Sequence, residues 1–416
     1  MISSFDLIYT IFLFIAIYIQ VFFLILFFEH KDDITKGDLK DEAFNLEDYP
    51  TITFLIPCWN EQDTVKKTIE SVLSLEYPKH KFHIIAIDDG SKDNTWQILQ
   101  EYQGHPQVTV LTKENGGKHS ALNHALTFVT SELVASFDAD TEIETNALMK
   151  AVPLFMKDDK LMALGGTVLI SEPKTFVQKA QEIEYQIFAF TKKMLGLAEG
   201  VFVVPGAFSI FRKEVFDIVG GYRNAHNLED IELTMRMHTY GLKIDHAHNA
   251  IVRTKGPDTV KGLFKQRLRW SHGFIMNMID YRTLLFNKTY KNLGMFTLPM
   301  TVFTYFILLF VFGYSVYKVG LAAYESLLKL YLVGFTHVEL PRLDLFFVNT
   351  KIYAIMALFV YVTIITSYIL GRRLAGVTKQ NFWNIPYFIL IYSFLAPFWV
   401  IKSIYSWLTA KRVGWR

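Results

Sequence analysis

Long apolar runs separate membrane segments from a soluble block along this chain. Residues 7–28 are apolar or weakly polar apart from Gln20. That is about 22 residues, or ~33 Å of helix, which is enough to cross a bilayer. Three further runs, at 294–317, 346–370 and 384–408, are near the same length. The pattern predicts four spans, with the soluble residues between the first and the second.

The first run fits an anchor better than a cleaved signal. A secretory signal has a basic region before its apolar run and a small-residue cleavage site after it, and neither is present around residues 7–28. Lys31, Lys36 and Lys40 follow the run, whereas nothing basic precedes it. By the positive-inside rule the N-terminus is expected outside and the following domain in the cytoplasm.

The orientation of the last run is left open. Basic residues before the second run and between the third and fourth fit the cytoplasmic side of a four-span protein. The basic tail at Lys411 and Arg412 does not, because four crossings leave the C-terminus outside. An alternative is that Pro386 and Pro397 break the last run into a re-entrant or interfacial piece, which would keep the tail inside.

Between the first two spans, short β-branched runs alternate with helical stretches. Apolar residues at helical spacing follow the first run, at Val65, Ile69, Val72 and Leu73. This alternation predicts an α/β fold, a mainly parallel mixed sheet with helices on its faces. The predicted strands are Thr51 to Ile56, Phe82 to Ile87, Val108 to Leu111 and Leu133 to Phe137.

Five regions follow from these patterns. We expect an N-terminal transmembrane helix at 1–30, a linker at 31–50 and a cytosolic domain at 51–256. Residues 257–290 mix basic, aromatic and apolar positions, which is typical of helices lying at a membrane surface. A C-terminal transmembrane region is expected at 291–416.

Composition agrees with this division. Apolar residues make up 51% of the chain and charged residues 20%, so charge must be segregated from the apolar spans. A net charge of only +2 argues against nucleic acid as a partner. Cys58 is the only cysteine, which excludes an intramolecular disulfide and fits a domain facing the reducing cytosol.

Carboxylates follow the fourth predicted strand at alternate positions. Asp138 and Asp140 flank Ala139 directly after Phe137. In open α/β sheets ligands bind beyond the carboxyl ends of strands, and two such carboxylates can hold a divalent cation that in turn holds a diphosphate. A solvated turn is the alternative. We interpret the pair as a metal site, for Mg²⁺ or Mn²⁺.

Polar residues also follow the second and third predicted strands. Asp88-Asp89-Gly90-Ser91 reads as a turn, but a carboxylate there can also accept a hydrogen bond from the N–H of a uracil ring. Asn115-Gly-Gly-Lys118 opens a helix predicted over Lys118 to Val129. Its amides and Lys118 could face a phosphate, or it is only a loop.

Two later motifs complete the candidate chemistry. Glu229 and Asp230 either cap a helix or supply a general base that deprotonates an acceptor hydroxyl. Gln266, Arg269 and Trp270 share one helical face. They are either an interfacial pair of cation and aromatic ring, or a clamp in which Arg269 binds phosphate and Trp270 packs on a sugar.

In this order, the motifs resemble those of the processive, membrane-integrated family 2 glycosyltransferases, the group that contains poly-N-acetylglucosamine, hyaluronan and cellulose synthases. The resemblance covers about residues 51–273. Residues 115–123 and the four-span arrangement look most like the biofilm-associated poly-N-acetylglucosamine synthases. Leu228 departs from the pattern, since Thr often precedes the Glu-Asp pair.

The resemblance implies a fold of the glycosyltransferase A type and a role for each motif. Asp89, with Asp88, would contact uracil, and Lys118 the nucleotide. Asp138 and Asp140 would hold the diphosphate, with the metal at Asp140. The remaining implied residues are Asp230 with Glu229 at the base, Arg269, Trp270 and Gln266 at the diphosphate and acceptor, and Gly206 in a loop beside the acceptor.

The implied function is transfer from a UDP-sugar, most readily UDP-N-acetylglucosamine, to a growing β-linked polysaccharide that leaves through the membrane. The lipid bilayer, and a small membrane accessory subunit, are the other implied partners, and the plasma membrane is the expected location. Two alternatives stay open: a single transfer to a membrane lipid, and a scaffold that has lost its chemistry.

Overall fold

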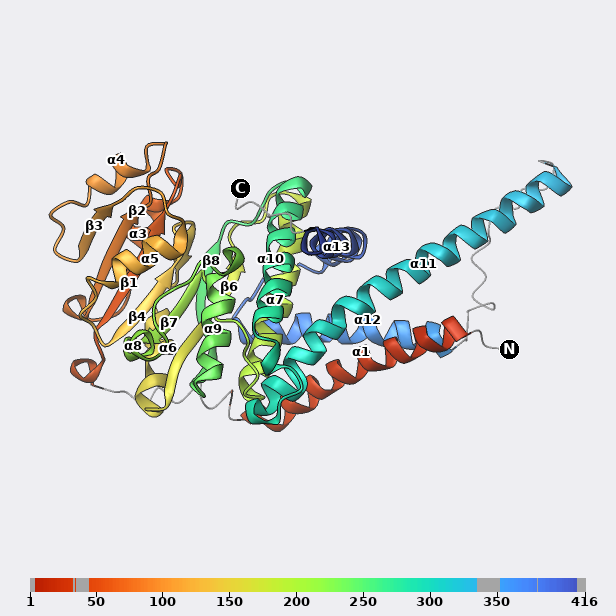
Figure 1. Cartoon of the computed structure of the whole chain (residues 1–416), viewed down its shortest axis with the longest axis horizontal. Coiled ribbons are helices and arrows are strands. Elements are labelled where there is room, and N and C mark those ends of the chain that lie inside the picture. The colour runs from red at the N-terminus through yellow and green to blue at the C-terminus, as the bar shows by residue number, and fades with distance from the viewer. Residues whose placement is uncertain (1–3, 33, 35–44, 335–351, 380, 410–416) are drawn as a thin grey trace.

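The computed structural model describes residues 4–32, 34, 45–334, 352–379 and 381–409. A sheet domain forms one end of the molecule, and apolar helices run away from it at the other (Figure 1). Most of the predicted linker at 31–50, the start of the run predicted at 346–370, and the basic tail from Lys411 onward lie outside the described residues.

The sheet is mixed, as predicted. Its eight strands lie in the order β3-β2-β1-β4-β7-β6-β8-β5. β1 is parallel to both β2 and β4, and β2 to β3, whereas β7 is antiparallel to β4 and β6. The bounds are β1 Ile52–Cys58, β2 Phe82–Asp88, β3 Val108–Thr112, β4 Leu133–Phe137, β5 Thr141–Ile143, β6 Leu161–Ile170, β7 Phe208–Arg212 and β8 Lys243–Thr254.

Both faces of the sheet are buried, which explains why its central strands are continuous apolar runs. Along β1, Phe54 packs into one core cluster and Leu55 into the other, on the opposite face. α3 (Val65–Leu73) covers the Phe54 face, and α5 (Lys118–Leu126) covers the Leu55 face. The predicted strands and the helix at α3 are confirmed, and α5 ends three residues before the predicted Val129.

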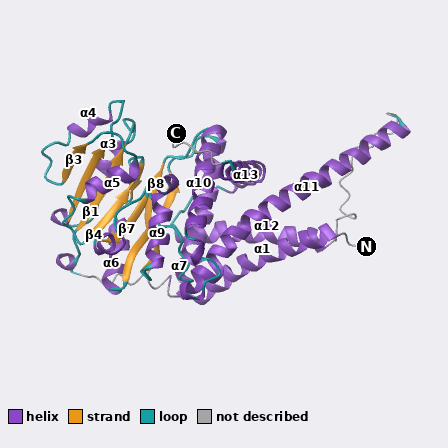
Figure 2. Cartoon of the chain, viewed as in Figure 1, coloured by secondary structure: helices purple, strands orange, loops and turns teal. Residues whose placement is uncertain are grey.

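The remaining helices of the sheet domain are short, apart from α7. They are α4 Thr95–Gln100, α6 Ala147–Lys157, α7 Phe176–Leu197, α8 Glu214–Val219 and α9 Glu229–Thr239. The long α7 and α10 (Val260–Asp280) lie between the sheet and the apolar helices (Figure 2), and an ion pair between Glu184 and Arg267 joins them. These two helices therefore form the layer that joins the two ends of the molecule.

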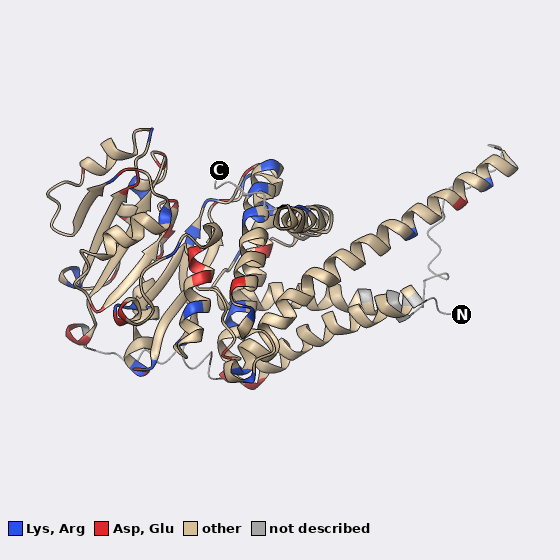
Figure 3. Cartoon of the chain, viewed as in Figure 1, with Lys and Arg blue, Asp and Glu red and all other residues tan. Residues whose placement is uncertain are grey.

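Three described helices are long and apolar enough to cross a membrane, which indicates a membrane protein. They contain Leu7–Glu29, Leu293–Leu332 and Phe382–Leu408, and match the first, second and fourth predicted runs. α12 (Ile352–Leu374) occupies the third run, so the count of four spans stays a prediction. Few charged residues lie on α1 (Ser4–Glu29), α11 (Leu298–Val333) and α12 (Figure 3).

Gln20, the one strongly polar residue of the first run, accepts a hydrogen bond from Ser367 of α12 at 3.1 Å. α1 packs along α12, and α12 packs on α7. A polar contact between two apolar helices fixes how they pair, since an unpaired amide would be costly there. The N-terminal helix is thus tied to the rest of the molecule through α12.

The last run forms one helix that lies across the others. α13 (Ile385–Leu408) continues through Pro397, with Pro386 in its first turn, so the prolines do not break it. α1, α11 and α12 run across the view in Figure 1, whereas α13 is seen end-on. It packs on α7, α10 and α11. The direction of α13 favours an interfacial helix over a fourth span.

Candidate active site

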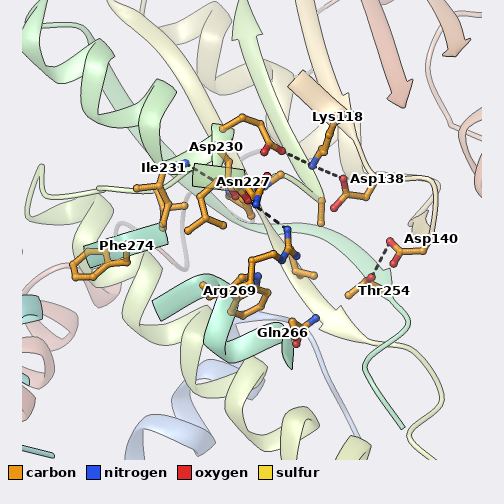
Figure 4. Close-up of a pocket in the computed structure, with 18 of the residues that line it drawn as sticks. Lys118, Asp138, Asp140, Asn227, Asp230, Ile231, Thr254, Gln266, Arg269 and Phe274 are labelled. Carbon is orange, nitrogen blue, oxygen red and sulfur yellow. Dashed lines mark hydrogen bonds and ion pairs between the residues drawn. The ribbon is translucent and has the colours of Figure 1, made fainter. Parts of the chain in front are cut away.

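One pocket of about 1160 Å³ runs from the carboxyl ends of β1, β2 and β4 to α7, α10 and α11. Its lining contains every residue predicted for the site except Asp88. Parallel strands bring three of these motifs to one edge of the sheet, where the register pairs Cys58 with Asp88. The other motifs arrive from helices (Figure 4).

The neighbouring Asp88 and Asp89 have different surroundings. Asp88 is buried and accepts hydrogen bonds from the backbone N–H of Ser91 and the hydroxyl of Thr112, each at 3.3 Å. Its carboxylate stabilises the turn, and the structure does not bring it to the pocket. Asp89 lines the pocket, so the predicted uracil contact falls on this residue.

Asp89 also holds the glycine loop in place. Its carboxylate accepts the N–H of Gly116 at 3.0 Å and of Gly117 at 2.8 Å, and forms an ion pair with Lys113 at 2.8 Å. A carboxylate has about four acceptor positions, so one remains for a ligand. The loop that opens α5 is thereby fixed to the end of β2.

Lys118, the first residue of α5, joins the two acidic motifs. Its ammonium lies 2.7 Å from Asp138 and 2.9 Å from Glu229 (Figure 4). Burial works against its charge, but the surrounding carboxylates outweigh burial and raise the pKa of Lys118. The lysine is therefore permanently charged, and it fixes β4 relative to α9.

The Asp138 and Asp140 pair fits a divalent cation. Burial raises the pKa of Asp140 to about 7, with further contributions from the charges of Asp138 and Glu61. Thr141 and Thr254 both donate to Oδ1 of Asp140, which leaves Oδ2 without a hydrogen bond among the described residues. Concentrated negative charge and an available carboxylate oxygen suit Mg²⁺ or Mn²⁺.

No group of three or more His, Cys, Asp or Glu side chains in the described part of the chain makes a preformed metal site. A cation at Asp138 and Asp140 would need further oxygen ligands from a bound diphosphate or water. Metal binding and donor binding are therefore expected to depend on one another.

Asp230 lies in the first turn of α9 with its carboxylate held by backbone amides. Oδ1 accepts the N–H of Ile231 at 2.8 Å, and Oδ2 the N–H of Gly206 at 3.2 Å. Burial and the charge of Glu229 raise the pKa of Asp230, against the opposing charge of Lys118. A raised pKa suits a general base that works near neutral pH.

The pKa of Glu229 is shifted in the opposite direction. Burial acts to raise the pKa of this carboxyl, but the Lys118 ammonium lowers it below its usual value. The pKa values of the two adjacent carboxylates are therefore shifted in opposite directions, down for Glu229 and up for Asp230. A Cβ atom at Gly206 would lie 2.8 Å from Nζ of Lys118, so a larger residue there would displace the ammonium from its ion pairs.

The segment before α9 is strained and held by α10. Ala225, His226 and Asn227 all have positive φ, of 43°, 57° and 65°, which is costly for side chains other than glycine. Arg269 donates to the carbonyl of Asn227 at 3.5 Å, and Asn277 to that of Ala225 at 3.3 Å. α10 thus positions the start of the helix that carries Asp230.

α10 presents Gln266, Arg269 and Trp270 to the pocket, as their spacing predicts. Oε1 of Gln266 is buried and has no hydrogen-bond partner among the described residues, so it is available to a ligand. The guanidinium of Arg267 stacks on the Trp270 ring at 4.1 Å and fixes its orientation. Arg267 itself is buried in an ion pair with Glu184 of α7 at 2.5 Å.

Sequence reasoning missed the contribution of α7. Its residues Tyr185, Phe188, Ala189 and Lys192 line the pocket at spacings of three and four. This is the ordinary pattern of a buried helix face, so nothing marked it as part of a site. Lys192 was the one available signal, because it interrupts that apolar stripe.

Comparison with known proteins identifies the family that the sheet domain resembles. The family described as glycosyl transferase family 2 matches residues 53–220. The chain contains a family 2 glycosyltransferase domain. The matched segment includes β1 to β7, with Asp89, Lys118, Asp138, Asp140 and Gly206, and it ends before α9.

Similar proteins extend the family 2 match beyond this segment. Over 224 residues the chain is 37% identical to a poly-beta-1,6-N-acetyl-D-glucosamine synthase of Staphylococcus epidermidis, covering 53% of this chain and 54% of the relative. It is 31% identical over 265 residues to a synthase of the same name from Staphylococcus aureus strain MSSA476, covering 63% and 64%. The chain thus spans about half the length of the first relative and less than two thirds of the second.

A solved structure supports the fold of the family 2 domain. A mannosyltransferase from Pyrobaculum calidifontis, in complex with GDP-mannose and Mn²⁺, superimposes with a TM-score of 0.56. Sequence identity is 17%, and the match covers 85% of this chain and 98% of the mannosyltransferase. The glycosyltransferase A fold predicted from the sequence is confirmed.

Proposed function

We propose that this chain is a membrane-bound inverting glycosyltransferase that adds N-acetylglucosamine from UDP-N-acetylglucosamine to a growing β-linked polysaccharide. The observation that carries the proposal is that one pocket contains all the predicted motifs. It joins the carboxylate pair at the end of β4, the carboxylate of Asp230 and the polar face of α10. The similarity to poly-beta-1,6-N-acetyl-D-glucosamine synthases supports this choice of sugar.

The donor occupies the strand ends in this proposal. Asp89 accepts a hydrogen bond from the uracil N–H, and the amides of the loop before Lys118 face phosphate. Asp138 and Asp140 would hold Mg²⁺ or Mn²⁺, which would supply positive charge to the departing diphosphate. With Asp138 and Glu229 held by Lys118, the donor binds beside a preformed charge network.

Asp230 acts as the base. An acceptor hydroxyl gives its proton to this carboxylate while its oxygen attacks the anomeric carbon, and the bond to the diphosphate of UDP breaks. The N–H groups of Ile231 and Gly206 hold the carboxylate in one orientation. Attack opposite the leaving group gives inversion, and a β-linked product from an α-linked donor.

The acceptor lies against α10. Trp270 offers an aromatic plate fixed by Arg267, and Gln266 offers an unpaired carbonyl oxygen to sugar hydroxyls. The pocket continues to Thr301 and Tyr305 of α11, on the side of the apolar helices. We propose that the polymer leaves in this direction, which makes the enzyme processive and an exporter.

The proposed topology has the family 2 domain in the cytoplasm of a multi-pass plasma-membrane protein. α1, α11 and α12 cross the bilayer, and α7, α10 and α13 lie along its cytosolic surface. An interfacial α13 keeps the basic tail at Lys411 and Arg412 inside, in agreement with the positive-inside rule. Protease protection of a C-terminal tag tests this, because a tag resistant in inside-out vesicles contradicts it.

A donor screen tests the function. Purified membranes receive UDP-glucose, UDP-N-acetylglucosamine or UDP-glucuronate with Mn²⁺, with and without a chelator, and products are sized and digested with linkage-specific hydrolases. We expect metal-dependent, long β-linked product from UDP-N-acetylglucosamine alone. A single labelled sugar on lipid would indicate the lipid alternative, and the absence of UDP binding would indicate a scaffold. Co-purification with a small membrane protein would identify an accessory subunit.

A further inference from the structure

A lysine that the mechanism above does not use faces the same pocket. Lys192 lies on α7, on the helix face that lines the pocket through Tyr185, Phe188 and Ala189. It makes no ion pair or hydrogen bond with a side chain in the part of the chain that the structure describes. The other half-buried lysine of the pocket, Lys118, is held by two carboxylates.

The charge of Lys192 interacts with that of the proposed base. The carboxylate whose charge stabilises it is that of Asp230, the proposed base. His246 of β8 also lines the pocket; it is buried and hydrogen-bonded to Thr167 at 3.1 Å, and burial and the Lys192 charge lower its pKa. Burial lowers the pKa of Lys192 to about 8, so it remains largely protonated at neutral pH.

Two exposed lysines, Lys255 and Lys265, also line the pocket, and water screens their charge. Lys192 differs because it is only partly exposed, on the face of α7 that lines the pocket, where water screens a charge less. Its neighbour Lys193 does not line the pocket. Two consecutive lysines of α7 therefore differ in position: Lys192 lines the pocket and Lys193 does not.

We propose that Lys192 determines which acceptor sugars the enzyme extends, by binding neutral N-acetylated ends and excluding ends that carry a free amine. This rests on the proposed function. An ammonium donates hydrogen bonds to hydroxyl and acetamido oxygens of a neutral sugar. A de-N-acetylated sugar is itself a cation at neutral pH, and two like charges in an enclosed pocket repel strongly.

The test compares two acceptors in purified enzyme with UDP-N-acetylglucosamine held constant. One is a β-linked N-acetylglucosamine oligomer, and the other is the same oligomer fully de-N-acetylated. We expect wild-type kcat/KM to favour the N-acetylated oligomer at least tenfold. In Lys192→Met that ratio should fall about tenfold, with UDP affinity by calorimetry unchanged.

Three further variants separate specificity from folding. Lys192→Arg keeps the charge and should keep the discrimination, whereas Lys192→Gln should lose it as Lys192→Met does. Lys193→Met is the matched control and should resemble wild type. The inference is overturned if Lys192→Met and Lys192→Gln bind UDP and discriminate like wild type, or if Lys193→Met loses discrimination equally. A wild type that extends neither oligomer with UDP-N-acetylglucosamine contradicts the proposed function instead.

Discussion

The two ends of the pocket are built in different ways. At the sheet end, Asp89 and Asp138 follow the ends of β2 and β4, and Lys118 begins α5, the helix after β3. Each is held by neighbouring backbone or charge. At the membrane end, Lys192 and Gln266 come from the faces of long helices, and within the described residues neither the Lys192 ammonium nor Oε1 of Gln266 is held by another side chain. The first end is preorganised, whereas the second keeps polar groups available.

This difference indicates how the two substrates are treated. A nucleotide is the same in every cycle, so its site can be rigid. A polymer end must arrive, react and move on, which is easier past groups that are not already engaged. If the two ends of the pocket differ in this way, some substitutions will affect the transfer reaction, others folding, and others the use of acceptors.

The largest effect is expected from Asp230→Asn. The amide keeps the shape but cannot accept the proton, so sugar incorporation should fall by about 10²–10⁴-fold. Incorporation of labelled sugar by membranes with matched protein levels measures this, and Asp217→Asn on the exposed side of α8 is the control. Near wild-type incorporation by Asp230→Asn would show that the base has been assigned to the wrong residue.

Arg267→Met is expected to affect folding more than chemistry. It leaves the buried Glu184 carboxylate without its ion-pair partner and with only the hydrogen bond from Tyr392, and it removes the stacking on Trp270. Breaking a buried ion pair typically costs about 3–5 kcal/mol. Thermal unfolding of the purified protein measures the loss. Arg269→Met, two residues away in the same motif, should unfold nearly like wild type yet lose activity. Equal destabilisation by both variants would show that Arg267 has no special role in folding.

Gly371→Ala tests the contact between α12 and α7. A Cβ atom there would overlap the backbone carbonyl of Gln186, which no side-chain movement can relieve. Overpacking of this kind costs about 1–3 kcal/mol. Gly320→Ala, in α11 with no atom within 4 Å of its Cβ position, is the matched control and should be neutral or slightly stabilising. Comparable loss in both variants would mean that α12 does not pack as described.

The smallest effect is expected from Asp88→Asn. One oxygen still accepts from Ser91 or Thr112, so about 1 kcal/mol of stability should be lost, without loss of UDP binding. Asp89→Asn should weaken UDP binding strongly, because it disturbs the glycine loop as well as the nucleotide contact. Calorimetry with UDP distinguishes the two variants. Similar losses of UDP affinity in both would mean that Asp88 also contributes to the nucleotide site.

Much of the sheet end could be predicted from the sequence because strand ends and their polar residues are local patterns. β1 to β4 are apolar runs that stop at polar residues, and Asp138 and Asp140 follow one of them directly. The direction of α13 and the pocket face of α7 could not be predicted. Both depend on how long helices pack, and an apolar stripe looks the same whether it faces a core, a bilayer or a polysaccharide.

The close approach of Gly371 to α7 limits how this protein can be divided. One side of α7 lines the pocket, while another packs on α12 and α13. A fragment that stops after α10 would retain every proposed catalytic residue and still leave those apolar surfaces of α7 uncovered, in contact with water. Such a fragment is expected to aggregate, so biochemical work on the transfer reaction needs the membrane helices present in detergent or a lipid nanodisc.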